Sequence, residues 1–164
     1  MLDKIGGFET ALGPGTLTAG SEDHDLFFRV LKRGYALVYE PAALLWHQHR
    51  RDMEGLEMQL TNFGRGELAY MTHLFLNYPD ERFRVFSLLR WWFLKHGVQR
   101  MWREIRHPSG FPRRLILAEM RGSLEGPKAY FRARRQARQI AAGNYESSQF
   151  ATLWKEGEKL AKVD

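Results

Sequence analysis

The sequence predicts an α/β fold in its first third, with one helix and two short strands, followed by a mostly α-helical carboxy-terminal region. Three observations lead to this prediction. Apolar residues recur at helical spacing in 26–31. Two short apolar runs follow, at 35–39 and 43–47, and from Asp52 onward the apolar residues again have helical periodicity.

The first helix has clear start and stop signals. Ser21 is suited to the N-cap, and three carboxylates would follow in the first turn, where the helix dipole favours negative charge. Gly34 supplies a stop after a basic last turn. The stretch before the helix, 6–20, is rich in Gly and Thr, so we expect it to be a mobile loop outside the core.

Two short strands are predicted after this helix. The first is Tyr35–Tyr39, ended by Pro41, and the second is Ala43–His47. Two short strands do not form a stable sheet on their own. They need partner strands that this sequence does not contain, so we expect an incomplete domain.

Only helices are predicted beyond the strands, at about 52–76, 81–106, 111–121, 127–142 and 147–161. The 81–106 helix combines aromatic and basic residues with few acids, which is typical of a helix in a membrane interface. An ordinary core helix with a basic outer face is the open alternative. We therefore divide the chain into residues 1–52 and a helical extension, residues 53–164.

Composition narrows the classes of function. The 164 residues include no cysteine, which excludes disulfides, thiolate nucleophiles and cysteine-ligated zinc. The formal net charge of +6 favours an anionic partner. No nucleic-acid-binding motif is evident, so an anionic membrane surface is preferred to nucleic acid. With no signal peptide or membrane-spanning stretch in the sequence, we expect a cytoplasmic protein, peripheral at the inner face of the cell membrane.

The densest acidic group is Glu22-Asp23-His24-Asp25. Repulsion among three carboxylates can raise the pKa of one of them, as a general base working near neutral pH requires. The alternative is that acids simply belong in a first helical turn and that Asp25 pairs with Arg29 four residues later.

A second group of polar residues follows the second strand. His47 and His49 are two residues apart and can share one metal ion. Arg50 and Arg51 could hold a diphosphate. The alternatives are packed or surface histidines and solvated charge ahead of a helix.

Six pieces of the first third of the chain, in this order and spacing, resemble family 2 glycosyltransferases. They are Gly6-Gly7-Phe8-Glu9, Gly20-Ser21-Glu22-Asp23-His24-Asp25-Leu26, Arg29, Gly34-Tyr35, Tyr39-Glu40-Pro41-Ala42-Ala43 and Trp46-His47-Gln48-His49-Arg50-Arg51. The resemblance covers residues 5–52. A weaker similarity, at 126–130 and the arginines that follow, is to the tail of some bacterial members.

The resemblance implies a partial GT-A fold, the nucleotide-diphospho-sugar transferase fold. It also implies an inverting transfer from a nucleotide-sugar donor to a hydroxyl of a saccharide or lipid-linked acceptor. By this resemblance Asp23 is the base that deprotonates the acceptor hydroxyl, and Glu22 is a neighbour that orients the acceptor.

The same resemblance implies a divalent cation, Mg²⁺ or Mn²⁺, that neutralises the leaving diphosphate. His47 corresponds to the family's metal ligand, and His49 is the less favoured ligand. Asp25 and Arg29 correspond to positions of structural support.

In this family the nucleotide-binding strands and an Asp-x-Asp metal motif precede the Gly-Gly-Phe segment, which here begins at Gly6. We therefore expect a carboxy-terminal fragment that does not transfer sugar as an isolated chain. The competing hypothesis is a non-catalytic basic module that binds membrane surfaces.

Overall fold

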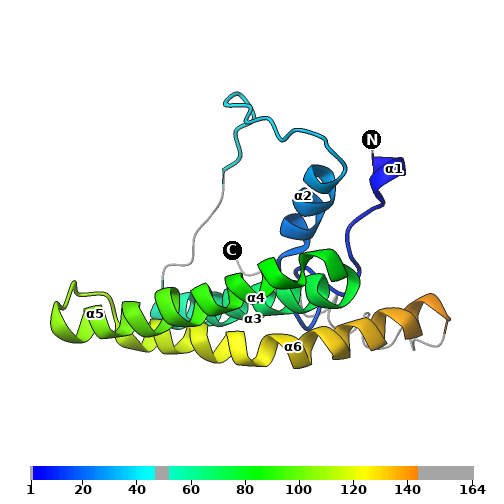
Figure 1. The fold of residues 1–164 in the computed structure, drawn as a ribbon. Coiled ribbons are helices and arrows are strands. Elements are labelled where there is room, and N and C mark those ends of the chain that lie inside the picture. Colours follow the sequence, from blue (N-terminus) through cyan, green and yellow to red (C-terminus); the bar gives the residue numbers. More distant parts are fainter. Residues whose placement is uncertain (1, 47–51, 144–164) are drawn as a thin grey trace, which may run out of the picture.

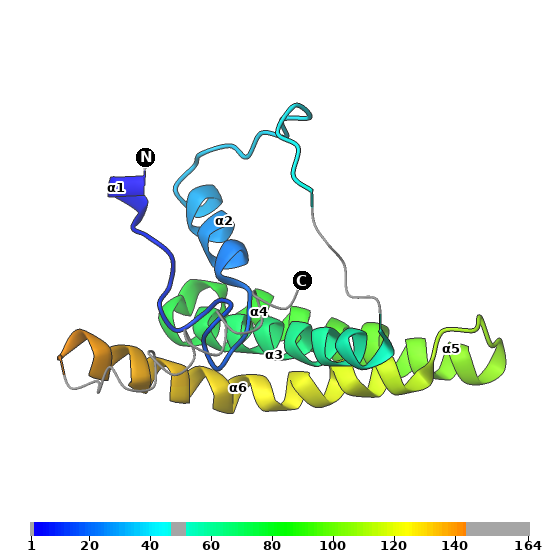
Figure 2. The same cartoon turned by 180° about the vertical axis from the view of Figure 1, so that it is seen from behind.

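A computed structural model of the chain describes residues 2–46 and 52–143. Its helices are α1 (Leu2–Ile5), α2 (Glu22–Lys32), α3 (Met53–Asn77), η1 (Pro79–Glu81), α4 (Arg82–Trp91), η2 (Trp92–Gln99), α5 (Arg100–Arg106) and α6 (Arg113–Ala141). Helices α3, α4 and α6 run along one another in a layer, and α2 stands over one end of it (Figure 1). Figure 2 shows α5 at the opposite end of this layer.

Helices α3 and α6 form the centre of the fold because their backbones approach very closely. A Cβ atom added to Gly64 would lie 2.1 Å from the carbonyl oxygen of Glu119, and one added to Gly122 would lie 1.9 Å from that of Thr61. Only glycine permits such an approach. Small buried residues recur along this face of α6, namely Ala118, Gly122, Ser123, Gly126, Ala129 and Ala133.

Helix α6 is continuous, so the prediction of two helices at 111–121 and 127–142 is wrong. Pro127 lies inside it, where proline removes one hydrogen bond and strains an isolated helix. Close packing on both sides of the proline offsets this cost. A Cβ on Gly126 would lie 2.7 Å from the Arg65 carbonyl oxygen, and Ala129 is buried.

The helices predicted at 52–76 and 81–106 are confirmed, as α3 and as the continuous run α4–η2–α5. The middle of this run, η2, is a π-helix, which has wider turns than an α-helix. Such segments are rare in proteins, and those that occur are often found at functional sites. None of the helices in the described part of the chain is long and apolar enough to cross a membrane. The helix predicted at 147–161 lies outside the described residues.

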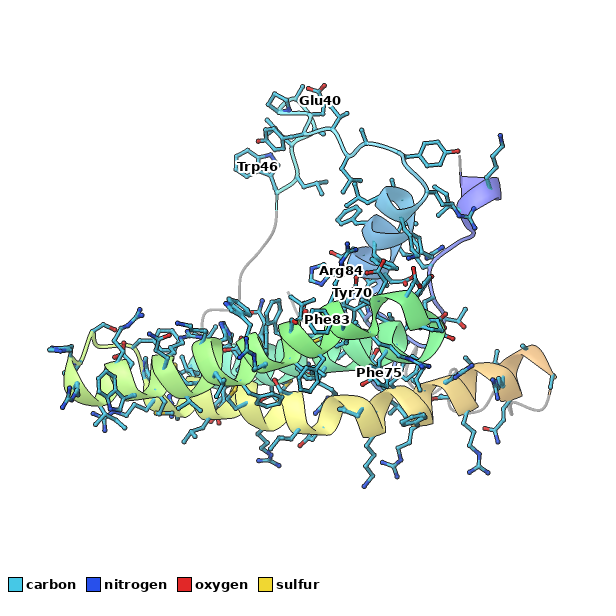
Figure 3. All side chains as sticks on the ribbon, in the orientation of Figure 1. Glu40, Trp46, Tyr70, Phe75, Phe83 and Arg84 are labelled. Atoms are coloured by element: carbon cyan, nitrogen blue, oxygen red, sulfur yellow. The ribbon has the colours of Figure 1, made fainter. Side chains whose placement is uncertain are left out.

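The predicted α/β class is wrong for residues 2–46 and 52–143, which contain helices and no strand. Residues 35–46 form an exposed arc with only local hydrogen bonds, such as that from the Ala43 N–H to the Glu40 carbonyl. Figure 3 shows Glu40 and Trp46 on this arc, away from the helices. The physical reason is that an apolar run becomes a strand only against a partner strand, and the described chain offers none.

The Gly- and Thr-rich loop ahead of α2 is part of the core, contrary to the expectation of a mobile loop. Ala11 and Leu12 are buried against Ala69 of α3 and Tyr130 of α6. The hydroxyl of Thr18, itself fully buried, donates to the Ala11 carbonyl at 3.1 Å. The loop therefore fixes the position of α2 above the α3–α6 pair.

Candidate functional site

The turn that leads into α2 has a strained backbone. Ala19 and Ser21 have φ values of 65° and 71°, a left-handed region that residues other than glycine seldom adopt. Ser21 precedes α2 as predicted, but its side chain makes no capping hydrogen bond. It packs instead on α3, where a Cβ on Gly66 would lie 3.0 Å from its Oγ. Because such strain persists only where the surroundings fix it, the start of α2 is held in one conformation.

The carboxylates of Asp23 and Asp25 lie in opposite environments. Helical residues are about 100° apart around the axis, so positions i and i+2 point to nearly opposite sides. Asp23 is exposed, and its Oδ1 accepts from the His24 N–H at 2.9 Å. Asp25 is 1% exposed, and Glu22 is half-buried. The acidic cluster thus presents Asp23 to solvent and buries Asp25.

Arg29 joins α2 to the Gly-Gly segment near the amino terminus. Its Nε donates to Asp25 Oδ2 at 2.8 Å. Its Nη1 donates to the Ile5 carbonyl at 2.8 Å, and its Nη2 to the Gly7 carbonyl at 2.7 Å. A guanidinium has donors in a fixed fork, so one side chain can hold a carboxylate and several carbonyls together. Asp25 and Arg29 thereby tie residues 5–7 to the helix that carries Asp23.

The buried end of this network lies on α3 and α6. The Nε2 of His73 is 3.1 Å from Asp25 Oδ1, an ion-pair distance without the alignment of a hydrogen bond. The Nδ1 of His73 is 2.9 Å from the Tyr130 hydroxyl, to which Asn77 Nδ2 also donates at 3.3 Å. Polar groups from α2, α3 and α6 therefore meet at one buried point.

This arrangement shifts the pKa of Asp25 and the pKa of Tyr130. Burial by itself would raise the pKa of Asp25, but the contacts with His73 and Arg29 outweigh burial and hold that pKa below its ordinary value. Burial raises the pKa of the Tyr130 hydroxyl. At neutral pH the network therefore contains an ionised Asp25 and a neutral Tyr130.

His24 forms a separate polar contact beside Asp23. Its Nδ1 lies 2.8 Å from Glu67 Oε1, and its ring meets that of Tyr70 edge to face at 5.9 Å between centroids. The contact with Glu67 raises the pKa of His24 above its ordinary value, although burial opposes this. A proton on His24 therefore strengthens the link between α2 and α3.

We expect this link to depend on pH. Because the pKa of His24 is raised in the folded state, its contribution to stability is complete below the ordinary value of 6.5 and is lost as the pH rises through the folded value. An NMR titration of the His24 ring will give a pKa above 6.5, and Glu67→Gln will return it toward 6.5. An unchanged pKa in Glu67→Gln would contradict this assignment.

The predicted metal and diphosphate residues His47, His49, Arg50 and Arg51 lie outside the described residues. Within the described part of the chain, no group of three or more His, Asp or Glu side chains could hold a metal ion. The carboxylates of the acidic cluster therefore do not converge on a metal site of their own.

Sequence reasoning missed His73, Asn77 and Tyr130, which complete the surroundings of Asp25. One signal was available, because His73 and Asn77 are four residues apart and share a face of α3. Asn77 Nδ2 lies 3.2 Å from His73 Nδ1. A buried polar side chain such as His73 predicts a polar partner from another element, but the sequence does not say which element supplies the partner.

Comparisons of this chain with protein-family models, with curated proteins and with solved structures found no match.

Proposed function

We propose that this chain belongs to an inverting glycosyltransferase of family 2, which transfers a sugar from a nucleotide-sugar donor to a hydroxyl of a saccharide or lipid-linked acceptor. Asp23 is the general base in this proposal, and Glu22 orients the acceptor. The proposal rests on the resemblance of residues 5–52 to that family and on the setting of Asp23.

The setting of Asp23 is the single observation that carries the proposal. A general base must reach the proton it removes and must be held in place. Asp23 is exposed, yet it lies in the first turn of a helix that is fixed by the strained turn at Ser21 and by Arg29. This anchoring fixes the backbone that carries the exposed carboxylate, which supports a role for Asp23 as the base.

The exposed arc 35–46 supports a second part of the proposal, that donor binding needs further polypeptide. Four apolar residues of the arc are almost fully exposed to solvent: Val38 at 85%, Tyr39 at 89%, Leu45 at 95% and Trp46 at 100%. Exposed apolar residues in such number mark a contact surface. In the proposal this surface meets the part of the enzyme that holds the nucleotide, and the isolated chain does not transfer sugar.

The proposal includes a divalent cation, Mg²⁺ or Mn²⁺, with His47 as a ligand and Arg50 and Arg51 near the diphosphate. Such an ion would neutralise the leaving diphosphate. The described residues do not form its site, so its remaining ligands belong to the nucleotide-holding part.

Nucleotide release tests the proposal. Protein made from the whole reading frame that contains residues 1–164 is mixed with a panel of nucleoside-diphosphate sugars, Mn²⁺ or Mg²⁺ and saccharide or lipid-linked acceptors. We expect release of the nucleotide with at least one donor, its loss on chelation of the metal, and no release by residues 1–164 alone. Absence of release and of transfer with every donor would overturn the proposal.

A further inference from the structure

An apolar groove of about 510 Å³ runs between the helical run η2–α5 and helix α6. Its walls include Val98, Met101, Trp102 and Ile105 on one side and Leu117 and Leu124 on the other. Five of these six side chains are more than half exposed, up to 72% for Leu124. Monomeric proteins seldom leave such a contiguous apolar surface open to water unless it binds something.

The helices around this groove are strongly basic. Residues 82–118 contain nine Lys and Arg residues and one acidic residue, Glu104, and no Asp. The Glu104 carboxylate accepts hydrogen bonds from the N–H and the hydroxyl of Ser109. The carboxylate of Glu119, just beyond this range, pairs with Arg100 and His96. The region therefore has a large excess of positive charge.

Part of this charge is free to meet an anion. Lys95 and Arg103 line a second hollow of about 460 Å³ on the same helical run, and no carboxylate of the described residues pairs with either of them. The guanidinium of Arg106 lies 4.5 Å from the ring of Trp102, a groove residue. Arg106 thus borders the apolar groove, while Lys95 and Arg103 lie on the other side of the same helical run, the division into an apolar and a basic face that interfacial helices have.

We propose that this face of η2, α5 and α6 docks on an anionic phospholipid bilayer. A bilayer supplies acyl chains for the groove and phosphates for the cations, as the helices of interfacial proteins require. Tryptophan at the boundary and long basic side chains that extend to the headgroups fit the same position. A helix of a protein partner would fill the groove but would leave Lys95 and Arg103 without anions, unless it were also acidic.

The proposed membrane docking does not depend on the proposed sugar transfer, so a negative result for one proposal leaves the other standing. Co-sedimentation of the chain with vesicles of phosphatidylcholine and phosphatidylglycerol in equal parts tests the docking, with pure phosphatidylcholine vesicles in parallel. We expect binding to the mixed vesicles that weakens with added salt, and little binding to the neutral ones. Asp23→Asn should bind the vesicles as the unaltered chain does.

Two pairs of variants locate the surface. Lys95→Gln with Arg103→Gln should weaken binding about 25-fold, since each cation near an anionic surface is worth about fivefold. Leu117→Ser with Leu124→Ser should weaken it about tenfold or more. Arg33→Gln and Leu44→Ser, exposed residues away from the groove, are the matched controls and should bind unchanged. Circular dichroism confirms that each variant keeps its helices.

Several outcomes would overturn the docking proposal. These are no co-sedimentation with the mixed vesicles, equal binding to neutral vesicles, or groove variants that bind as well as the controls do. A self-associated chain that Leu117→Ser with Leu124→Ser converts to a monomer would also overturn it, because a second copy would then cover the groove.

Discussion

Asp25→Asn is expected to lower the free energy of unfolding by about 3 kcal/mol, because it removes one partner of a buried ion pair and leaves the other without its counter-charge. Asp25 is 1% exposed and holds Arg29 Nε at 2.8 Å. Arg29 in turn holds the carbonyls of Ile5 and Gly7, so the amino-terminal segment should loosen as well. Urea unfolding followed by circular dichroism measures the loss.

Asp23→Asn is the matched control, since it makes the same change two residues earlier on the same helix. Asp23 is exposed, and exposed substitutions usually change stability by less than about 0.5 kcal/mol. The pKa of Asp25 is depressed in the folded state, so its contribution is present above the ordinary value of 3.8 and is lost as the pH falls through the folded value. The difference between the unaltered chain and Asp25→Asn should therefore shrink in acid. Equal stability of the two variants at neutral pH would contradict the buried network.

Gly122→Ala is expected to destabilise the protein by about 3 kcal/mol, the upper range for added volume in a packed core. In an open helix the same change would stabilise by about 1 kcal/mol, because alanine is the better helix former. Here the new Cβ would lie 1.9 Å from the carbonyl oxygen of Thr61, which is backbone and cannot turn away. For a chain of this size the melting temperature should fall by about 6 to 12 °C.

Gly7→Ala provides the comparison for this helix-packing prediction. A Cβ there meets nothing within 4 Å, and Gly7 does not have a left-handed backbone. Its melting temperature should stay close to that of the unaltered chain. A Gly122→Ala variant that melts at or above the unaltered chain would show that α3 and α6 do not pack backbone to backbone.

Local signals predicted the helices well, because spacing, caps and stops lie within each helix. The helices α2 and α3 begin and end within about two residues of the predicted bounds, and Gly34 has the positive φ that a stop requires. Non-local packing decided the features that were missed. The burial of Ala11 and Leu12 depends on α3 and α6, and the continuity of α6 through Pro127 depends on its contact with α3.

In the candidate site, too, features set by local sequence could be predicted, and features set by long-range packing could not. The opposite orientations of Asp23 and Asp25 follow from helical geometry alone, and the pairing of Asp25 with Arg29 follows from their spacing. His73 and Tyr130 could not be assigned to this site from the sequence. They come from helices far along the chain, and only the packing of α2 over α3 and α6 brings them to Asp25.

The central claim is that Asp23 is the exposed general base of a sugar transfer and that α2 is anchored to present it. The most direct test is the rate of sugar transfer per folded molecule in Asp23→Asn made from the whole reading frame, with Glu54→Gln, an exposed acid in the first turn of α3, as the control. We expect Asp23→Asn to keep the melting temperature and to transfer sugar about 10² to 10⁴ times more slowly, while Glu54→Gln transfers at the normal rate. An Asp23→Asn protein that is folded and transfers sugar at the rate of the unaltered protein would contradict the claim.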